Sequence, residues 1–133
     1  MTLSDLRDAR YITLETFRRN GQGVKTPVWQ TPEGGCLYVW TQATSGKAKR
    51  IRHRGRVRVC ASDARGVPRS EWVEARARLL TTPESLAAQR RRMAARYGLA
   101  FWLFYAFARL SRKPYVVIEL CDAEPPTGST APA

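Results

Sequence analysis

The chain has 133 residues, of which 44% are hydrophobic and four are tryptophan. This length and composition favour one globular domain and exclude a wholly disordered polypeptide. Lysine and arginine number 23 against 11 aspartate and glutamate, so a net charge of +12 makes the folded surface attract anions. The first ten residues lack the apolar core of a signal peptide, and the most apolar run, residues 99–110, is well short of the ~20 residues that span a bilayer. We therefore predict a soluble, cytoplasmic protein with no membrane span.

Residues 2–9 predict a short opening helix with Ser4 as its candidate N-cap. Three β-branched and aromatic segments follow, joined by glycine-containing turns, at residues 11–19, 24–30 and 36–42. Pro27 in the second segment predicts an edge, a bulge or the start of a strand, because proline cannot donate to a neighbouring strand. The pattern is that of a three-stranded meander.

Residues 45–54 carry one apolar pair, Ala48 and Ile51, which predicts a short helix that lies on the surface of the sheet and ends before Gly55. Strict alternation then predicts two further strands, at residues 56–62 and 71–81.

Thr82 as N-cap and Pro83 at the first helical position predict a helix that runs to about residue 98. A more apolar helix at residues 99–111 leads into a last strand at residues 114–120. The result is a mainly β protein in which six strands form a small barrel-like antiparallel sheet with helices at its margins. One domain would occupy residues 1–121, and the Pro-, Ser- and Thr-rich residues 122–133 would form a disordered tail.

Three cysteines are spaced far apart in the chain and lie in apolar stretches: Cys36, Cys60 and Cys121. An odd count without a C-x-x-C pair suits neither a zinc site nor a disulfide framework. We expect three buried, reduced thiols.

The sequence TSGKAKRIRHRGRVRVC, residues 44–60, concentrates basic residues without any acidic one. Its start predicts a phosphate site at a helix N-terminus, where free N–H groups and the helix dipole favour an anion. Ser45 can donate a hydroxyl, Gly46 permits close approach, and Lys47 and Arg50 add charge. Three later arginines are expected to face solvent: Arg52, Arg54 and Arg56.

Nucleic-acid binding is the second interpretation of this charge, because basic surfaces bind polyanions. Trp29, Tyr38 and Trp40, which could stack on bases, lie in predicted core strands, and no zinc-finger or RNP pattern is present. Hydrolytic chemistry has weak support, because His53 has no evident Ser or Cys partner. If the chain is an enzyme, its reactive group is expected to come from a cofactor.

Several segments together resemble the split β-barrel flavin and deazaflavin oxidoreductases, relatives of pyridoxamine phosphate oxidase, and in particular the PPOX-class F420-dependent oxidoreductases. The likeness covers residues 11–98, and the segments that carry it are TFR at 16–18, TPVW at 26–29, LYVWT at 37–41 and SGKAKR at 45–50. The resemblance implies a homodimeric, FMN-binding-like split barrel with two cofactor sites at the subunit interface.

In that family the phosphate ligands would be Thr41, Ser45, Gly46, Lys47 and Arg50, with Lys49 nearby. Four residues would border the ring of the cofactor: Thr26, Pro27, Val28 and Trp29. The implied cofactor is F420, whose acidic tail would use more positive charge, including that of the later arginines, than the alternative FMN.

The implied reaction is hydride transfer from reduced F420 to a small organic acceptor. An FMN-dependent oxidoreductase and a non-catalytic cofactor- or nucleic-acid-binding protein are the alternatives. The aromatic residues 99–110 depart from the family pattern. We expect this helix to be buried in the dimer or against the barrel; alternatively, Phe101, Trp102 or Tyr105 shapes an acceptor pocket or contacts lipid.

Overall fold

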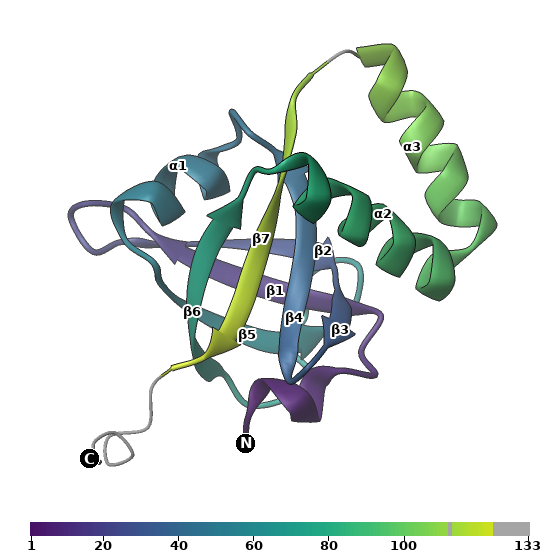
Figure 1. Ribbon diagram of the computed structural model, residues 1–133. Coiled ribbons are helices and arrows are strands. Elements are labelled where there is room, and N and C mark those ends of the chain that lie inside the picture. The colour runs from purple at the N-terminus through teal and green to yellow at the C-terminus, as the bar shows by residue number, and fades with distance from the viewer. Residues whose placement is uncertain (112, 124–133) are drawn as a thin grey trace, which may run out of the picture.

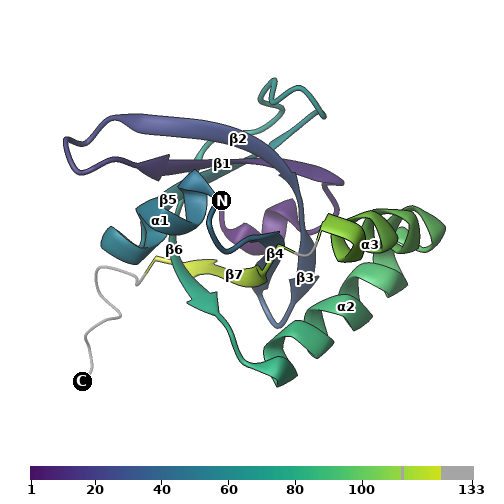
Figure 2. The same ribbon diagram turned by 90° about the horizontal axis from the view of Figure 1, so that it is seen from above.

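The computed structural model describes residues 1–111 and 113–123, and its centre is one antiparallel sheet with the strand order β2-β1-β5-β6-β7-β4-β3. The strands are β1 (Tyr11–Phe17), β2 (Gly23–Trp29), β3 (Thr31–Glu33), β4 (Cys36–Gln42), β5 (Arg56–Ser62), β6 (Val73–Leu80) and β7 (Tyr115–Asp122). The sheet curls so that β1, β2 and β5 run across β6, β7 and β4 (Figures 1 and 2). It is therefore a partly closed barrel, as a split barrel requires.

The six predicted strands are present, but the predicted strand number is wrong, because the described chain has a seventh strand, β3. This three-residue strand pairs with the start of β4 through the turn at Gly34 and Gly35, which both have positive φ. The sequence TPEGG at residues 31–35 predicts a turn throughout, and only pairing with β4 makes its first three residues a strand. Pro27 lies in β2 at the edge of the sheet, so the edge prediction is confirmed.

Alternation along the strands fills the inside of the barrel. The inward residues of β5 and β6 are Val57, Val59, Val73, Ala75 and Ala77, and all of them are buried. The arginines and the glutamate between them are more exposed, whereas Cys60 is buried on the opposite face of β5. Leu37 and Val39 of β4 join the same core from the opposite side. Period-two patterning thus fixes which face of each strand is inside.

The opening helix is a 3₁₀ turn, η1 (Leu3–Leu6), and its N-cap is Thr2 rather than the predicted Ser4. The Thr2 backbone N–H donates to the Asp5 carboxylate at 2.8 Å, which closes the capping box. β7 ends at Asp122, one residue past the predicted end of the domain. The Asp122 carboxylate accepts the Leu3 N–H at 2.8 Å and so joins this end of the strand to η1. The rest of the predicted tail, from residue 124, lies outside the described residues.

The other helices match their predicted positions: α1 (Gly46–His53), α2 (Pro83–Tyr97) and α3 (Leu99–Ser111). The hydroxyl of Thr82 accepts the Ser85 N–H at 3.1 Å, which confirms the predicted N-cap of α2. Figure 2 shows α1 over the opening between the two strand layers, with α2 and α3 together on the other side of the sheet. None of the helices in the described ranges is both long and apolar enough to cross a membrane.

Tyr97, the last residue of α2, ties the helices to the sheet. Its ring stacks on Trp29 with centroids 4.5 Å apart, and its hydroxyl donates to the Gln30 carbonyl at 2.6 Å. Gly98 follows with φ +56°, and this left-handed residue separates α2 from α3.

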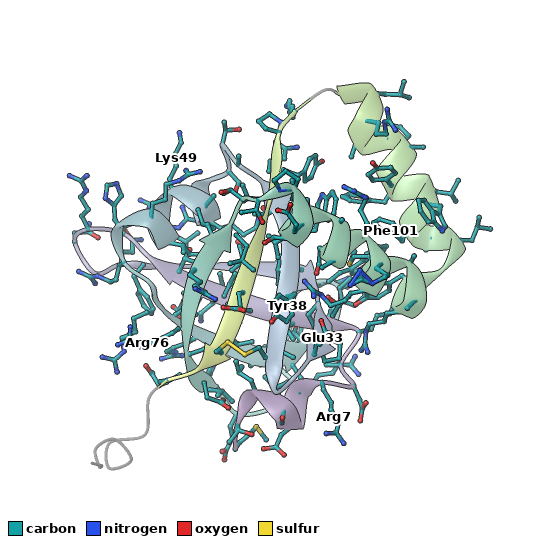
Figure 3. All side chains as sticks on the ribbon, in the orientation of Figure 1. Arg7, Glu33, Tyr38, Lys49, Arg76 and Phe101 are labelled. Carbon is teal, nitrogen blue, oxygen red and sulfur yellow. A yellow bond between two sulfur atoms is a disulfide. The ribbon has the colours of Figure 1, made fainter. Side chains whose placement is uncertain are left out.

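The prediction of three reduced thiols is wrong for two of them. Cys36 and Cys121 form a disulfide between the adjacent strands β4 and β7, visible as the yellow bond in Figure 3. They are 85 positions apart in sequence, so only strand pairing brings them together. Cys60 is buried and free, as predicted, and its burial raises the pKa of the thiol.

Candidate functional site

The N-terminus of α1 follows directly on the end of β4. Ser45 is the N-cap, and its Oγ accepts the Ala48 N–H at 3.2 Å. The hydroxyl of Thr41, which is buried at the end of β4, lies 3.3 Å from the Ser45 Oγ. The N–H groups of Gly46 and Lys47, which begin the helix, have no partner within it and are available to an anion.

Arg50 folds back over this first turn. Its Nε donates to the Thr16 hydroxyl on β1 at 2.6 Å. A Cβ placed on Gly46 would lie 2.7 Å from the Nη1 of Arg50. The absence of a side chain at Gly46 therefore lets the guanidinium lie across the start of the helix, as close approach to a glycine permits.

Three cations meet here: Arg18, Lys47 and Arg50. Burial, and next the charge of Arg50, lower the pKa of Lys47, while burial and the charge of Arg18 lower the pKa of Arg50. The ion pairs among the described residues include none of the three. Lys47 and Arg50 are partly desolvated, whereas Arg18 is exposed. A phosphate group would stabilise such a set of cations without a carboxylate. We call this set the cation cluster.

The remaining basic residues of this segment do not join the cluster. Lys49 is exposed and points away from the sheet (Figure 3). Arg54 is exposed, and the side chain of Arg52, also exposed, donates to the Ala43 carbonyl. Arg56 is exposed and pairs with Glu74 at 3.0 Å, which makes it a poor candidate for binding an acidic tail.

The single histidine lies at the far end of α1. A side-chain nitrogen of Arg19 lies 3.1 Å from the His53 Nε2, and both side chains are exposed. His53 thus has a cationic neighbour at the surface and is remote from the start of the helix, which agrees with the weak support for hydrolysis.

A cavity of about 200 Å³ lies between the strands β2 and β4 and the helices α2 and α3. It is lined by Val28 and Trp29 of β2, Trp40 of β4, Met93 of α2 and Phe104 of α3. Its walls are apolar and aromatic, which suits a planar ring system. We call it the aromatic cavity.

Trp40 lines this cavity with its indole ring. Its Nε1 is buried and has no hydrogen-bond partner among the described residues. An unpaired buried donor costs free energy. The rings of Tyr105 and Tyr115 pack against Trp40 at 6.2 and 5.5 Å, which fixes the indole in place.

The four predicted ring-binding residues of β2 divide into two pairs. Val28 and Trp29 line the aromatic cavity. Pro27 is exposed and lies near Gly66 of the loop after β5, and Thr26 is half-buried opposite Leu14. The structure therefore brings only half of the predicted set to the cavity.

Other lining and cluster residues were missing from the predicted site: Arg18, Trp40, Met93 and Phe104. Trp40 and Arg18 lie in segments that carried the family resemblance, so their position was a usable signal. Met93 and Phe104 reach the cavity only because α2 and α3 fold back on the edge strands, and no sequence spacing indicates this.

The geometry suits a cofactor with a ring at one end and a phosphate at the other. Thr16, which holds Arg50, is paired with Val24, and Val28 is four residues further along β2. At ~3.3 Å per residue the two positions are about 13 Å apart along the strand. The cation cluster and the aromatic cavity are thus separate places in the fold.

No protein-family model matches the sequence, and no curated protein matches it. Solved structures do. A structure named F420 reductase superimposes with a TM-score of 0.58 at 16% identity, covering 92% of this chain and 93% of that one. A FAD-binding protein from Mesorhizobium loti superimposes with a TM-score of 0.63 at 16% identity, covering 92% of this chain and 86% of that one. HutZ, a heme storage protein from Vibrio cholerae, superimposes with a TM-score of 0.67 at 13% identity, covering 92% of this chain and 89% of that one.

These similarities establish the fold. The chain has the split-barrel architecture of the pyridoxamine 5'-phosphate oxidase-like proteins, a fold shared by proteins with flavin-type, F420 and heme names. Some matched proteins are longer, since the chain spans 49% of Atu2129 from Agrobacterium tumefaciens, a protein of unknown function. The expected split barrel is thus confirmed, the expected homodimer stays a prediction, and the cofactor is left to the chemistry of the site.

Proposed function

We propose that this protein is an oxidoreductase that binds a flavin-type cofactor, with F420 preferred and FMN as the alternative. The observation that carries the proposal is the cation cluster at the start of α1, whose cations have no carboxylate partner in the described chain. Two similar folds that carry F420 and FAD names support the same class of ligand.

The proposed phosphate site consists of groups from three elements. Ser45, Gly46 and Lys47 supply a hydroxyl, backbone N–H groups and a cation from α1, while Thr41 ends β4 and Arg50 is braced on β1 through Thr16. Lys49 lies outside this cluster, so we assign it at most a long-range electrostatic effect.

The proposed ring site is the aromatic cavity. Val28 and Trp29 would flank the ring and the indole of Trp40 would pack against it, while Thr26 and Pro27 would contribute only backbone at the strand edge. A reduced deazaflavin or flavin supplies a hydride when bound. The apolar walls exclude water and hold the acceptor against the ring, so a small organic acceptor needs no acid–base residue of the protein to be positioned.

We further propose a homodimer, because the proteins that the sequence resembles bind their cofactor at a subunit interface. The cytoplasmic location stays a prediction. The Cys36–Cys121 disulfide weighs against it, because cytosolic thiols are kept reduced in most organisms.

A heme is less well suited to this site. The only histidine, His53, lies at the exposed end of α1 and contacts Arg19, away from the aromatic cavity. A histidine-ligated heme would therefore lack its ligand from this chain.

The test is a fluorescence titration of cofactor-free protein with F420 and, in parallel, with FMN. We expect saturable binding that is tighter for F420, and a loss of roughly 10-fold or more in affinity for Lys47→Ala, since a charge-assisted hydrogen bond is worth ~1.5–3 kcal/mol. Lys49→Ala is the matched control, because it removes the same charge two positions along the same helix from an exposed site. Analytical ultracentrifugation with and without cofactor reports the dimer.

Equal weakening by the two lysine variants would contradict a specific phosphate site and indicate binding by overall charge. Nucleic-acid binding would then be tested by its steep fall with salt concentration. Saturable binding without turnover in the presence of any acceptor would support the cofactor-binding alternative.

A further inference from the structure

The helix α3 has two apolar faces, and only one of them is covered. Phe101 is fully buried, and Figure 3 shows it on the side of α3 that faces α2. Its ring lies 5.7 Å from that of Tyr105 on the same face. Together with Met93 and Tyr97 it forms a second hydrophobic cluster that fastens α3 to α2.

The opposite face of α3 consists of large apolar side chains without cover. We call it the α3 stripe; its members, with their exposed fractions, are Leu99 (75%), Trp102 (50%), Leu103 (65%), Phe107 (77%) and Leu110 (80%). Their spacing of three, four or eight positions places them along one side of the helix. In Figures 1 and 3 no other element lies beside this outer side. Contiguous exposed apolar residues of this size indicate a surface that another molecule covers.

The charge around the stripe indicates what that molecule is. Residues 99–118 contain three lysines and arginines and no aspartate or glutamate. Arg109 and Lys113 are exposed and line one groove of about 330 Å³ beside Tyr105 and Tyr115, at the C-terminal end of α3. The partner must therefore accept apolar side chains and offer negative charge next to them.

A second copy of this chain satisfies only the first condition. A two-fold contact through the stripe would bring the same basic segment from both subunits together, without a carboxylate in residues 99–118 to pair with it.

We propose that α3 is an interfacial membrane helix, which lays the α3 stripe into the surface of a bilayer that contains anionic phospholipid. A 13-residue helix is about 20 Å long, too short to span but suited to lie in the plane of the interface. Trp102 lies at the depth that indoles favour, between acyl chains and headgroups, and Arg109 and Lys113 pair with the phosphates.

Phe104 connects this surface with the site described above. It lines the aromatic cavity and also a shallow groove of about 430 Å³ that Leu103 and Phe107 form with Tyr115. A bilayer on α3 would thus lie next to the cavity. Membrane binding itself needs no cofactor, so the proposal stands or fails independently of the proposed function.

The test is sedimentation of the full chain with vesicles of phosphatidylcholine alone or with 30% phosphatidylglycerol, at low salt and at about 0.5 M NaCl, where screening removes most attraction between exposed charges. The triple variant Leu103→Gln, Phe107→Gln, Leu110→Gln keeps every charge. We expect at least a tenfold loss of binding to the anionic vesicles for this variant. Val67→Gln, a change of an equally exposed apolar residue in a distant turn, is the control and should bind as the wild type does.

A second measurement serves if the triple variant does not fold. Brominated acyl chains should quench the tryptophan fluorescence of the wild type, and Trp102→Phe should remove most of that quenching. The other three tryptophans are partly buried in the protein, and the guanidinium of Arg58 covers the ring of Trp72 at 4.8 Å. Equal vesicle binding by the wild type and the triple variant would show that charge alone drives binding and would overturn the proposal. A wild-type dimer that the triple variant dissociates, without vesicle binding, would overturn it in favour of a second copy.

Discussion

The arginines of the sheet and the cations at the start of α1 differ in what neutralises them. On the sheet, Arg56 pairs with Glu74 at 3.0 Å, and Arg78 pairs with Glu119 at 2.5 Å. Around the start of α1, Lys47 and Arg50 have each other and Arg18 as charged neighbours, and no ion pair in the described chain includes them.

This difference separates structural charge from functional charge. A cross-strand ion pair satisfies itself and adds modest stability. Cations that are partly desolvated next to one another destabilise the empty protein, and the cost is offset when an anion binds. The following predictions test that distinction in order of expected effect.

Removing Arg50 should have the largest effect. We expect Arg50→Ala to weaken cofactor binding roughly 10- to 100-fold, because a charge-assisted contact of ~1.5–3 kcal/mol is lost. Arg56→Ala, which removes the same side chain from a paired site, should leave affinity unchanged. Fluorescence titration of both variants measures this, and an equal loss in both would remove the distinction.

Placing a methyl group on Gly46 should have a smaller effect of the same kind. In Gly46→Ala the new Cβ would lie 2.7 Å from the Arg50 Nη1, so the guanidinium must move. We expect roughly a tenfold loss of affinity, from a weakened charge-assisted hydrogen bond. In an Arg50→Ala background the same change should have almost no further effect, and a double-mutant cycle measures the coupling. Additive losses would mean that Gly46 acts without Arg50.

Breaking a paired site should alter stability and not affinity. The Glu119 carboxylate accepts from Arg78 and, at 3.1 Å, from the Tyr38 hydroxyl. We expect Glu119→Gln to lower the free energy of unfolding by about 1 kcal/mol, the usual worth of a partly exposed hydrogen-bonded pair. Urea denaturation measures this, and a changed cofactor affinity would show that the sheet arginines also serve the site.

The pH dependence should show the smallest effect. Burial lowers the pKa of Lys47 below its ordinary value, so between the two values the folded state binds fewer protons than the unfolded chain, and the stability of the empty protein rises with pH. An anion favours the charged lysine, so its binding should take up protons and weaken a few-fold as pH rises through this window. Calorimetry in two buffers of different ionisation enthalpy measures the uptake, which Lys47→Ala should abolish.

Several features could be predicted from the sequence because they depend on local patterns. Alternation placed β5 and β6 and their inward valines, and Thr82 followed by Pro83 marked the start of α2. The proposed phosphate site is of the same kind, since a helix start and its first turn contribute Ser45, Gly46 and Lys47 within three positions.

The tertiary structure decided what depends on residues far apart in the chain. Strand pairing joined Cys36 to Cys121 and created β3, because partners across a sheet follow from topology and not from spacing. The fold of α2 and α3 onto the edge strands brought Met93 and Phe104 to the aromatic cavity. The same packing buried one apolar face of α3 and left the other exposed. Because both faces are apolar, the periodicity of this helix does not predict which of them is buried.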